Sequence, residues 1–211
     1  MPVFQRLGAR MCSVIVAGLI GGTALAGCAP EAPMTPQTTH RETSAPTATT
    51  ATTTPEPIER QATQIPTACD AILPLNIVHG YDARLVPGQE GADVEATLSD
   101  LLGPTTMGAL RAGSSHMFCS WGIPQSDAMA FLGVATIDDQ AKTELLATLR
   151  QSVYVEVDAG GAEAVFQQGQ SFDHRYTDDI VIDGDLLVAV AHTISGDFAR
   201  DACTTVQATQ E

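Results

Sequence analysis

A long stretch without apolar periodicity, residues 29–67, confines compact folding to one part of the chain. This stretch is rich in threonine, proline and alanine, most densely over residues 47–55. Its apolar residues follow neither a 3.6-residue nor a 2-residue period, so no element here could bury enough surface to offset the loss of chain entropy. We therefore expect a disordered tether, which leaves residues 68–211 as the folded part.

The first 27 residues are typical of an export signal. Arg6 and Arg10 form a basic start, and residues 12–26 form an apolar run without any charge. This run is shorter than the roughly 20 residues that a membrane-spanning helix needs. Its length and its basic flank are those of a cleaved signal peptide. We expect the mature chain to lie outside the cytoplasm.

Residues 25–28, Leu-Ala-Gly-Cys, match the lipobox of bacterial lipoproteins, in which small residues precede a cysteine. By this resemblance, the signal peptide 1–27 is removed and the Cys28 thiol carries a diacylglyceryl group. Two acyl chains hold a protein stably on a bilayer, because each buried CH₂ contributes about 0.8 kcal/mol. We expect a lipid anchor, with acyl chains such as palmitate, on the extracytoplasmic face of the cell membrane, and residues 28–67 as lipidated cysteine and tether.

Residues 68–211 have the size of one domain and are too few for two. They contain 6 Lys and Arg residues against 21 Asp and Glu residues, a formal net charge of −15. Such a surface repels anionic lipid and nucleic-acid phosphate. We therefore expect no nucleic-acid binding, a membrane contact made by the Cys28 lipid alone, and neutral or basic partners.

Apolar residues at helical spacing predict five helices in this domain. Thr67 is a candidate N-cap of the first, and Ser195 caps the last. Gly103 and Pro104 end the second helix, and Asp138 or Asp139 lies near the start of the fourth, where a carboxylate is favoured. The expected helices cover residues 67–73, 92–102, 105–111, 138–150 and 197–207.

Alternating or continuous apolar residues predict strands over 117–122 and 128–137, and a weaker pattern suggests one over 76–86. Residues 180–182 and 186–194 flank Asp183 and Gly184, a strong signal for a hairpin with a type I′ turn. When the sequence is aligned with itself at a shift of 57 residues, residues 131–137 and the helix after them align with residues 188–194 and the helix after those. We expect one α+β domain with an antiparallel sheet and helices on one face. Two ββα-like halves are compatible with this arrangement.

The cysteines have different expected fates. Cys12 leaves with the signal and Cys28 is lipidated, so that three remain: Cys69, Cys119 and Cys203. Outside the cytoplasm an exposed thiol is usually oxidised, so we expect one disulfide and one free thiol, with three pairings open. We favour Cys69–Cys119, because Cys119 shares a strand face with Trp121 that a preceding helix could cover.

The order of these features resembles actinobacterial surface lipoproteins of unknown function. The shared features are Cys69 in an early short helix, a strand with Cys119-Ser-Trp121, a later hairpin, a C-terminal helix and the Thr/Pro-rich tether. The resemblance covers the mature chain and implies no activity. Cys203 departs from the simplest form of the pattern.

Five aspartates surround the second hairpin: Asp173, Asp178, Asp179, Asp183 and Asp185. Calcium is held by such oxygen ligands. However, the spacing lacks the D-x-D-x-D-G order of a calcium loop, and a turn accounts for Asp183 and Gly184. We expect no metal at these residues.

The sequence contains no motif that indicates a catalytic or cofactor-binding residue. The domain's histidines, His79, His116, His174 and His192, lack i, i+3 or i, i+4 spacing and the H-E-x-x-H order. Ser114 and Ser115 lack the G-x-S-x-G frame of a nucleophile, and Gly160-Gly161 lacks a phosphate-loop pattern. We expect a domain that binds an envelope ligand or a protein partner without catalysis. An envelope enzyme with a site assembled only in three dimensions, and an accessory subunit of an envelope complex, are the alternatives.

Overall fold

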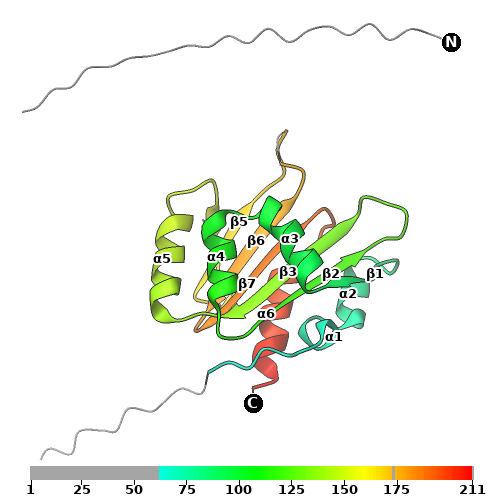
Figure 1. The fold of residues 1–211 in the computed structure, drawn as a ribbon. Coiled ribbons are helices and arrows are strands. Elements are labelled where there is room, and N and C mark those ends of the chain that lie inside the picture. Colours follow the sequence, from blue (N-terminus) through cyan, green and yellow to red (C-terminus); the bar gives the residue numbers. More distant parts are fainter. Residues whose placement is uncertain (1–61, 173, 211) are drawn as a thin grey trace, which may run out of the picture. The chain divides into compact units, whose positions relative to one another are not determined.

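A seven-stranded antiparallel sheet runs through the domain in the order β1-β2-β3-β7-β6-β5-β4 (Figure 1). The computed structural model describes residues 62–172 and 174–210. The predicted signal peptide, Cys28 and most of the predicted tether lie outside the described residues. The strands are β1 Val86–Glu90, β2 His116–Gly122, β3 Met129–Thr136, β4 Val155–Val157, β5 Ala164–Gln168, β6 Thr177–Asp183 and β7 Leu186–His192.

Helices pack against the sheet, which confirms the predicted α+β class. They are α1 Cys69–Ile72, α2 Leu75–Tyr81, α3 Ala92–Leu101, α4 Pro104–Ala112, α5 Asp139–Leu149 and α6 Phe198–Ala208. Three predicted helices agree closely with α3, α4 and α5. The Asp138 side chain caps α5 by accepting a hydrogen bond from the Ala141 amide at 2.7 Å.

The helices cover both faces of the sheet, and the prediction of one covered face was wrong. On β7, Val188 and Val190 face the core under α1, α2 and α6, whereas Leu187 and Ala189 face the core under α3, α4 and α5. Figure 1 shows α3 and α4 in front of the sheet and α6 on the other side. The nearly continuous apolar residues of β3 and β7 are those of strands buried on both faces.

The hairpin-then-helix order occurs twice, but it does not reflect equivalent halves. The 57-residue shift aligns Phe131 with Val188, and these side chains lie in cores on opposite faces of the sheet. The helices that follow, α5 and α6, also pack on opposite faces. Adjacent antiparallel strands related by a two-fold axis would place aligned side chains on the same face, so the ββα-like halves are not related in that way.

The turn between β6 and β7 differs from the prediction by one residue. Asp183 pairs with Leu186, so Gly184 and Asp185 are the two central residues of the turn. Only Gly184 has a positive φ, +62°. A type I′ turn needs a positive φ at both central residues, whereas type II′ needs one at the first, which favours glycine there.

Several local predictions also failed. Residues 75–81 form the seven-residue helix α2, which follows Pro74 and buries only Val78, where the sequence predicts a weak strand. The side chains of Thr67 and Ser195 cap no helix, since α1 begins after Ala68 and α6 after Asp197. The short strands β4 and β5 were missed.

One disulfide joins α1 to β2, with the predicted pairing of Cys69 and Cys119 and a Cα–Cα distance of 5.6 Å. Trp121, two residues further along β2, is 2% exposed in the same core. Cys203 on α6 is a buried free thiol. Burial, and to a lesser extent the charge of Asp183, raises the pKa of Cys203 to about 12, so this thiol is a poor nucleophile.

The folded part begins before residue 68, the position at which the sequence predicts the boundary. Thr63 bonds to Asp185, the Gln64 amide donates to the Gln210 side chain at 2.9 Å, and Ile65 is buried. These long-range contacts leave no periodic pattern in the sequence. Among the described residues, no helix is long and apolar enough to cross a membrane.

Candidate functional site

Two adjoining hollows of about 520 and 290 Å³ lie where α4, α5 and the β6–β7 turn meet the start of the described chain. They share four lining residues, so we treat them as one surface, the acidic groove. The shared residues are Ala62, Ile137, Asp138 and Asp185. The smaller hollow is also lined by mostly small side chains, those of Ala109, Ala112, Gly113, Ser114, Thr136 and Ala141. The larger hollow is also lined by mostly polar residues, Thr63, Asp139, Lys142 and Gly184.

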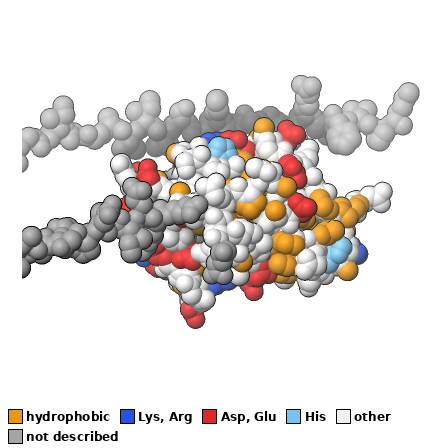
Figure 2. All heavy atoms as spheres, turned by 90° about the horizontal axis from the view of Figure 1, so that it is seen from below, with side chains coloured by type: hydrophobic (Ala, Val, Ile, Leu, Met, Phe, Trp, Pro, Cys, Tyr) orange, Lys and Arg blue, Asp and Glu red, His pale blue; other side chains and the backbone are white. Residues whose placement is uncertain are grey.

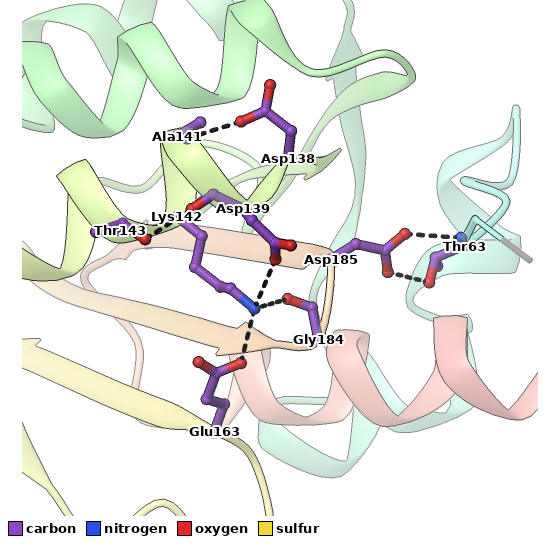
Figure 3. Close-up of polar contacts among 9 residues, drawn as sticks. All are labelled: Thr63, Asp138, Asp139, Ala141, Lys142, Thr143, Glu163, Gly184 and Asp185. Carbon is purple, nitrogen blue, oxygen red and sulfur yellow. Dashed lines mark hydrogen bonds and ion pairs between the residues drawn. The ribbon is translucent and has the colours of Figure 1, made fainter. Parts of the chain in front are cut away.

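Carboxylates surround the groove because the β3–α5 connection and the β6–β7 turn both place aspartates there (Figure 3). Asp138 is fixed by its cap on α5, and Asp139, in the first turn, has a fully exposed side chain. Asp185 occupies the second central position of the turn, where it accepts hydrogen bonds from Thr63.

Lys142 is the only cation among the described lining residues, and its ammonium is fully engaged. The Nζ atom donates to Glu163 at 3.1 Å and to the Gly184 carbonyl at 3.0 Å, and it lies 3.5 Å from Asp139 (Figure 3). The bond to Glu163 raises the pKa of Lys142, so the side chain stays charged. The charged Lys142 side chain therefore links α5 to the β6–β7 hairpin.

The groove is thus lined by three carboxylates, from Asp138, Asp139 and Asp185, against the single Lys142, which also pairs with Glu163. The excess negative charge suits a ligand with cationic or hydrogen-donating groups. Small apolar side chains in the adjoining hollow could contact an uncharged part of the same ligand. This arrangement suits the binding of such a ligand.

The five aspartates around the second hairpin do not form one site. Asp178 and Asp179 are buried on opposite faces of the sheet, Asp183 accepts a hydrogen bond from Gln207, and Asp185 lines the groove. Asp173 lies outside the described residues. Among the residues that the structure describes, no group of three or more His, Cys, Asp or Glu side chains could hold a metal ion.

Asp178 forms a buried polar cluster with Tyr154 and His174. The Tyr154 hydroxyl donates to Asp178 Oδ2 at 3.0 Å, and His174 Nε2 also lies 3.0 Å from that oxygen, without hydrogen-bond geometry. Asp178 Oδ1 is buried with no hydrogen-bond partner. Burial raises the pKa of Asp178, although the charge of His174 and the bond to Tyr154 lower it.

His192 and Asp179 form a second pair on the other face, with His192 Nε2 at 2.8 Å from Asp179 Oδ2. Gln167 donates to the other oxygen of Asp179 at 2.8 Å. His192 is 5% exposed and Asp179 is 7% exposed. Both ring nitrogens of His192 are bonded within the domain, so the pair is a structural element and cannot reach a substrate in this conformation.

The remaining two histidines, Ser114 and Gly160 lie apart from one another. His79 bonds to the Leu85 carbonyl at 3.0 Å, and His116 is an exposed side chain beside Phe118. Ser114 lies in the groove, where its hydroxyl pairs with that of Thr136 at 2.8 Å. Gly160 lies against Arg200, whose guanidinium donates to the Ala159 carbonyl.

A second surface feature is apolar. Figure 2 shows hydrophobic side chains gathered on one side of the domain as seen from below. Leu75 on α2 is 38% exposed and Val86 on β1 is 44% exposed. A hollow of about 270 Å³ lies along β1, lined by Val86, Pro87 and residues of the β2–β3 connection.

The fold and the groove together define a small α+β domain with an acidic ligand-sized surface. No protein-family model, no curated protein and no solved structure matches the chain.

The sequence contained only partial signals for the groove. The sequence predicts Asp138 or Asp139 near a helix start and Asp183-Gly184 as a turn, each for a local reason. Nothing local places these two segments side by side. Lys142, which joins them, is an ordinary surface residue in the sequence.

Proposed function

We propose that this protein is a lipid-anchored, extracytoplasmic lipoprotein whose domain binds an envelope ligand or a protein partner, without catalysis, in the acidic groove. The observation that carries the proposal is the charge of that groove, three carboxylates against one fully paired lysine, beside a hollow of small side chains.

The lipobox at residues 25–28 supports the anchor, and the Cys69–Cys119 disulfide fits an oxidising compartment. A tether of about 34 residues, from 28 to 61, would have a random-coil span of roughly 30–35 Å. That reach would separate the groove from the lipid headgroups. The acidic domain would also be repelled by anionic lipid, which leaves the groove free for a partner above the membrane.

The proposed partner is neutral or basic. Each of the groove's aspartates retains oxygens that can accept further hydrogen bonds, since a carboxylate has about four acceptor positions. A ligand with ammonium, guanidinium or hydroxyl groups would meet them, and its affinity would fall as added salt screens the charges.

The test is capture of partners by the lipidated protein from detergent-solubilised membranes, compared with an Asp138→Asn/Asp139→Asn variant. Asparagine is as good an N-cap as aspartate, so α5 should persist while the groove loses two charges. We expect capture to fall at least severalfold, and to weaken for the wild type between 50 and 500 mM salt.

The matched control is Asp93→Asn/Asp100→Asn, which removes two exposed carboxylates from α3. This variant should capture partners as the wild type does. Equal losses in both variants would assign the effect to net charge and not to the groove. Unchanged capture by the Asp138→Asn/Asp139→Asn variant would overturn the proposal.

A further inference from the structure

His192 lies at the end of β7 with both ring nitrogens bonded to oxygen atoms. Nε2 faces Asp179 Oδ2 at 2.8 Å, and Nδ1 bonds to the Ile194 carbonyl. A carbonyl oxygen only accepts hydrogen bonds, and an ionised carboxylate does the same. A neutral imidazole has one N–H and one lone pair, so it can satisfy only one of these two contacts.

The geometry therefore requires one more proton than neutral imidazole and ionised carboxylate provide together. With that proton the ring is an imidazolium ion, and both nitrogens donate. Without it, one ring nitrogen would present its lone pair to the Asp179 carboxylate or to the Ile194 carbonyl, and two acceptors would face each other inside the domain. A buried polar contact of that kind is destabilising, because neither acceptor has a donor.

The surrounding groups favour the protonated ring. Burial alone lowers the pKa of His192, but the bonds to Asp179 and Ile194 and the charge of Asp178 outweigh it, so the pKa lies above its ordinary value. Asp197 and Arg200 of the α6 start line a hollow with Asp179, and the Arg200 guanidinium is bonded to backbone carbonyls. From α2, Tyr81 packs on Phe198 and donates to Asp201.

The same contacts fix the start of α6. The Ile194 carbonyl belongs to the segment that leads into the helix, and the first residue of α6, Phe198, is fully buried with its ring 5.4 Å from that of His192. We propose that the His192–Asp179 pair holds the first turns of α6 on the sheet only while the imidazole carries two protons, so that rising pH loosens this helix.

The sign follows from proton binding. The folded state binds the His192 proton more tightly than the unfolded state, whose histidine has a pKa of about 6.5. The stabilisation is therefore complete below about pH 6.5 and is lost as the pH rises through the raised folded value. Between about pH 6.5 and that folded value the opening equilibrium of α6 should shift by up to about tenfold per pH unit, and above the folded value no further shift is expected.

Cys203 provides a local reporter, because it is a buried free thiol on α6. The experiment uses the full chain with Cys12→Ser and Cys28→Ser, in detergent, and measures the rate of Cys203 alkylation from pH 5.5 to 9. Each rate is divided by that of the unfolded chain at the same pH, which removes the intrinsic dependence on thiolate. We expect the resulting protection to fall severalfold or more as the pH rises.

Asp179→Asn is the diagnostic variant. Its amide can donate to a neutral His192 through Nδ2 while its oxygen still accepts from Gln167, so a neutral ring is satisfied at high pH. We expect its protection to be nearly independent of pH. If Asp179 acted through packing alone, the variant would lose Cys203 protection by the same factor at every pH. Its protection would then depend on pH in the same way as that of the wild type.

Two results would overturn the proposal: wild-type protection that does not change with pH, or an Asp179→Asn variant that keeps the wild-type slope. If that variant does not fold, ¹⁵N chemical shifts of the wild-type imidazole decide the matter. Both nitrogens should be protonated at pH 6.5, and a neutral His192 at that pH would refute the inference.

Discussion

The Asp185 carboxylate accepts two hydrogen bonds from Thr63, one from the backbone amide at 2.9 Å and one from the hydroxyl at 2.5 Å. The two residues are 122 positions apart in the sequence. This contact attaches the chain to the domain several residues before the predicted boundary, and it does so inside the acidic groove. The first described residues, Ala62 and Thr63, therefore also line the candidate site.

Asp185→Ala should free residues 62–67 and lower the free energy of unfolding by about 1–2 kcal/mol, because two hydrogen bonds to a carboxylate are lost. Limited proteolysis should cut the variant within 62–67 and leave the wild type protected from about residue 62 onward. Asp185→Asn keeps an acceptor oxygen and should behave intermediately. A wild-type fragment that begins at residue 68 would contradict this prediction.

Removing the disulfide with Cys69→Ser/Cys119→Ser should lower the free energy of unfolding by roughly 4 kcal/mol, as expected for a link that spans 50 residues. Urea unfolding measures this change. Thiol counting on the unfolded, unreduced domain should find one free group, Cys203. Three free groups in the wild-type domain would mean that the cysteines are not linked.

Asp178→Asn should raise the free energy of unfolding at pH 7 by about 1 kcal/mol, since the ionised side chain is buried with one unpartnered oxygen. A carboxyl with a raised folded-state pKa stabilises the fold at low pH, and that contribution is lost as the pH rises through the folded value. The variant should therefore lack this part of the pH dependence. Chemical denaturation from pH 3 to 7 tests it, and a less stable variant at pH 7 would contradict it.

Gly184→Ala should destabilise the domain by about 1–2 kcal/mol, because a φ of +62° brings a Cβ too close to the backbone. The matched control is Gly108→Ala, on the exposed side of α4, where an added Cβ meets nothing within 4 Å. Alanine favours the helix there, so the control should gain about 0.5–1 kcal/mol. Equal effects at both positions would rule out the turn conformation as the cause.

The anchor is tested by the intact mass of protein extracted from membranes. We expect a chain that begins at Cys28 and carries a diacylglyceryl group. Cys28→Ser should release the protein from the membrane or leave the precursor uncut. A mature chain that begins elsewhere without lipid would contradict the prediction.

Local patterns were sufficient for the elements whose burial is one-sided and regular. The Leu145 and Leu149 spacing of α5, the Gly103-Pro104 stop before α4 and the glycine in the β6–β7 turn follow from backbone and side-chain preferences of neighbouring residues. The α+β class and the Cys69–Cys119 pairing also agree with expectations from the sequence. The strands β4 and β5 were missed because they are short and lie near or at an edge of the sheet.

The amino-acid sequence alone was enough to predict the type of most segments: apolar strands, amphipathic helices, a capping aspartate and a polar stretch without the apolar residues for a core. Which distant residues meet depends on how these segments pack together. The antiparallel order places β3 beside β7 and buries both faces, and it brings the Asp138 segment to the β6–β7 turn. The same order buries His192 against Asp179, 13 residues away. Such contacts depend on the pairing of whole strands, whose free energy is spread over many residues, so no local pattern reveals them.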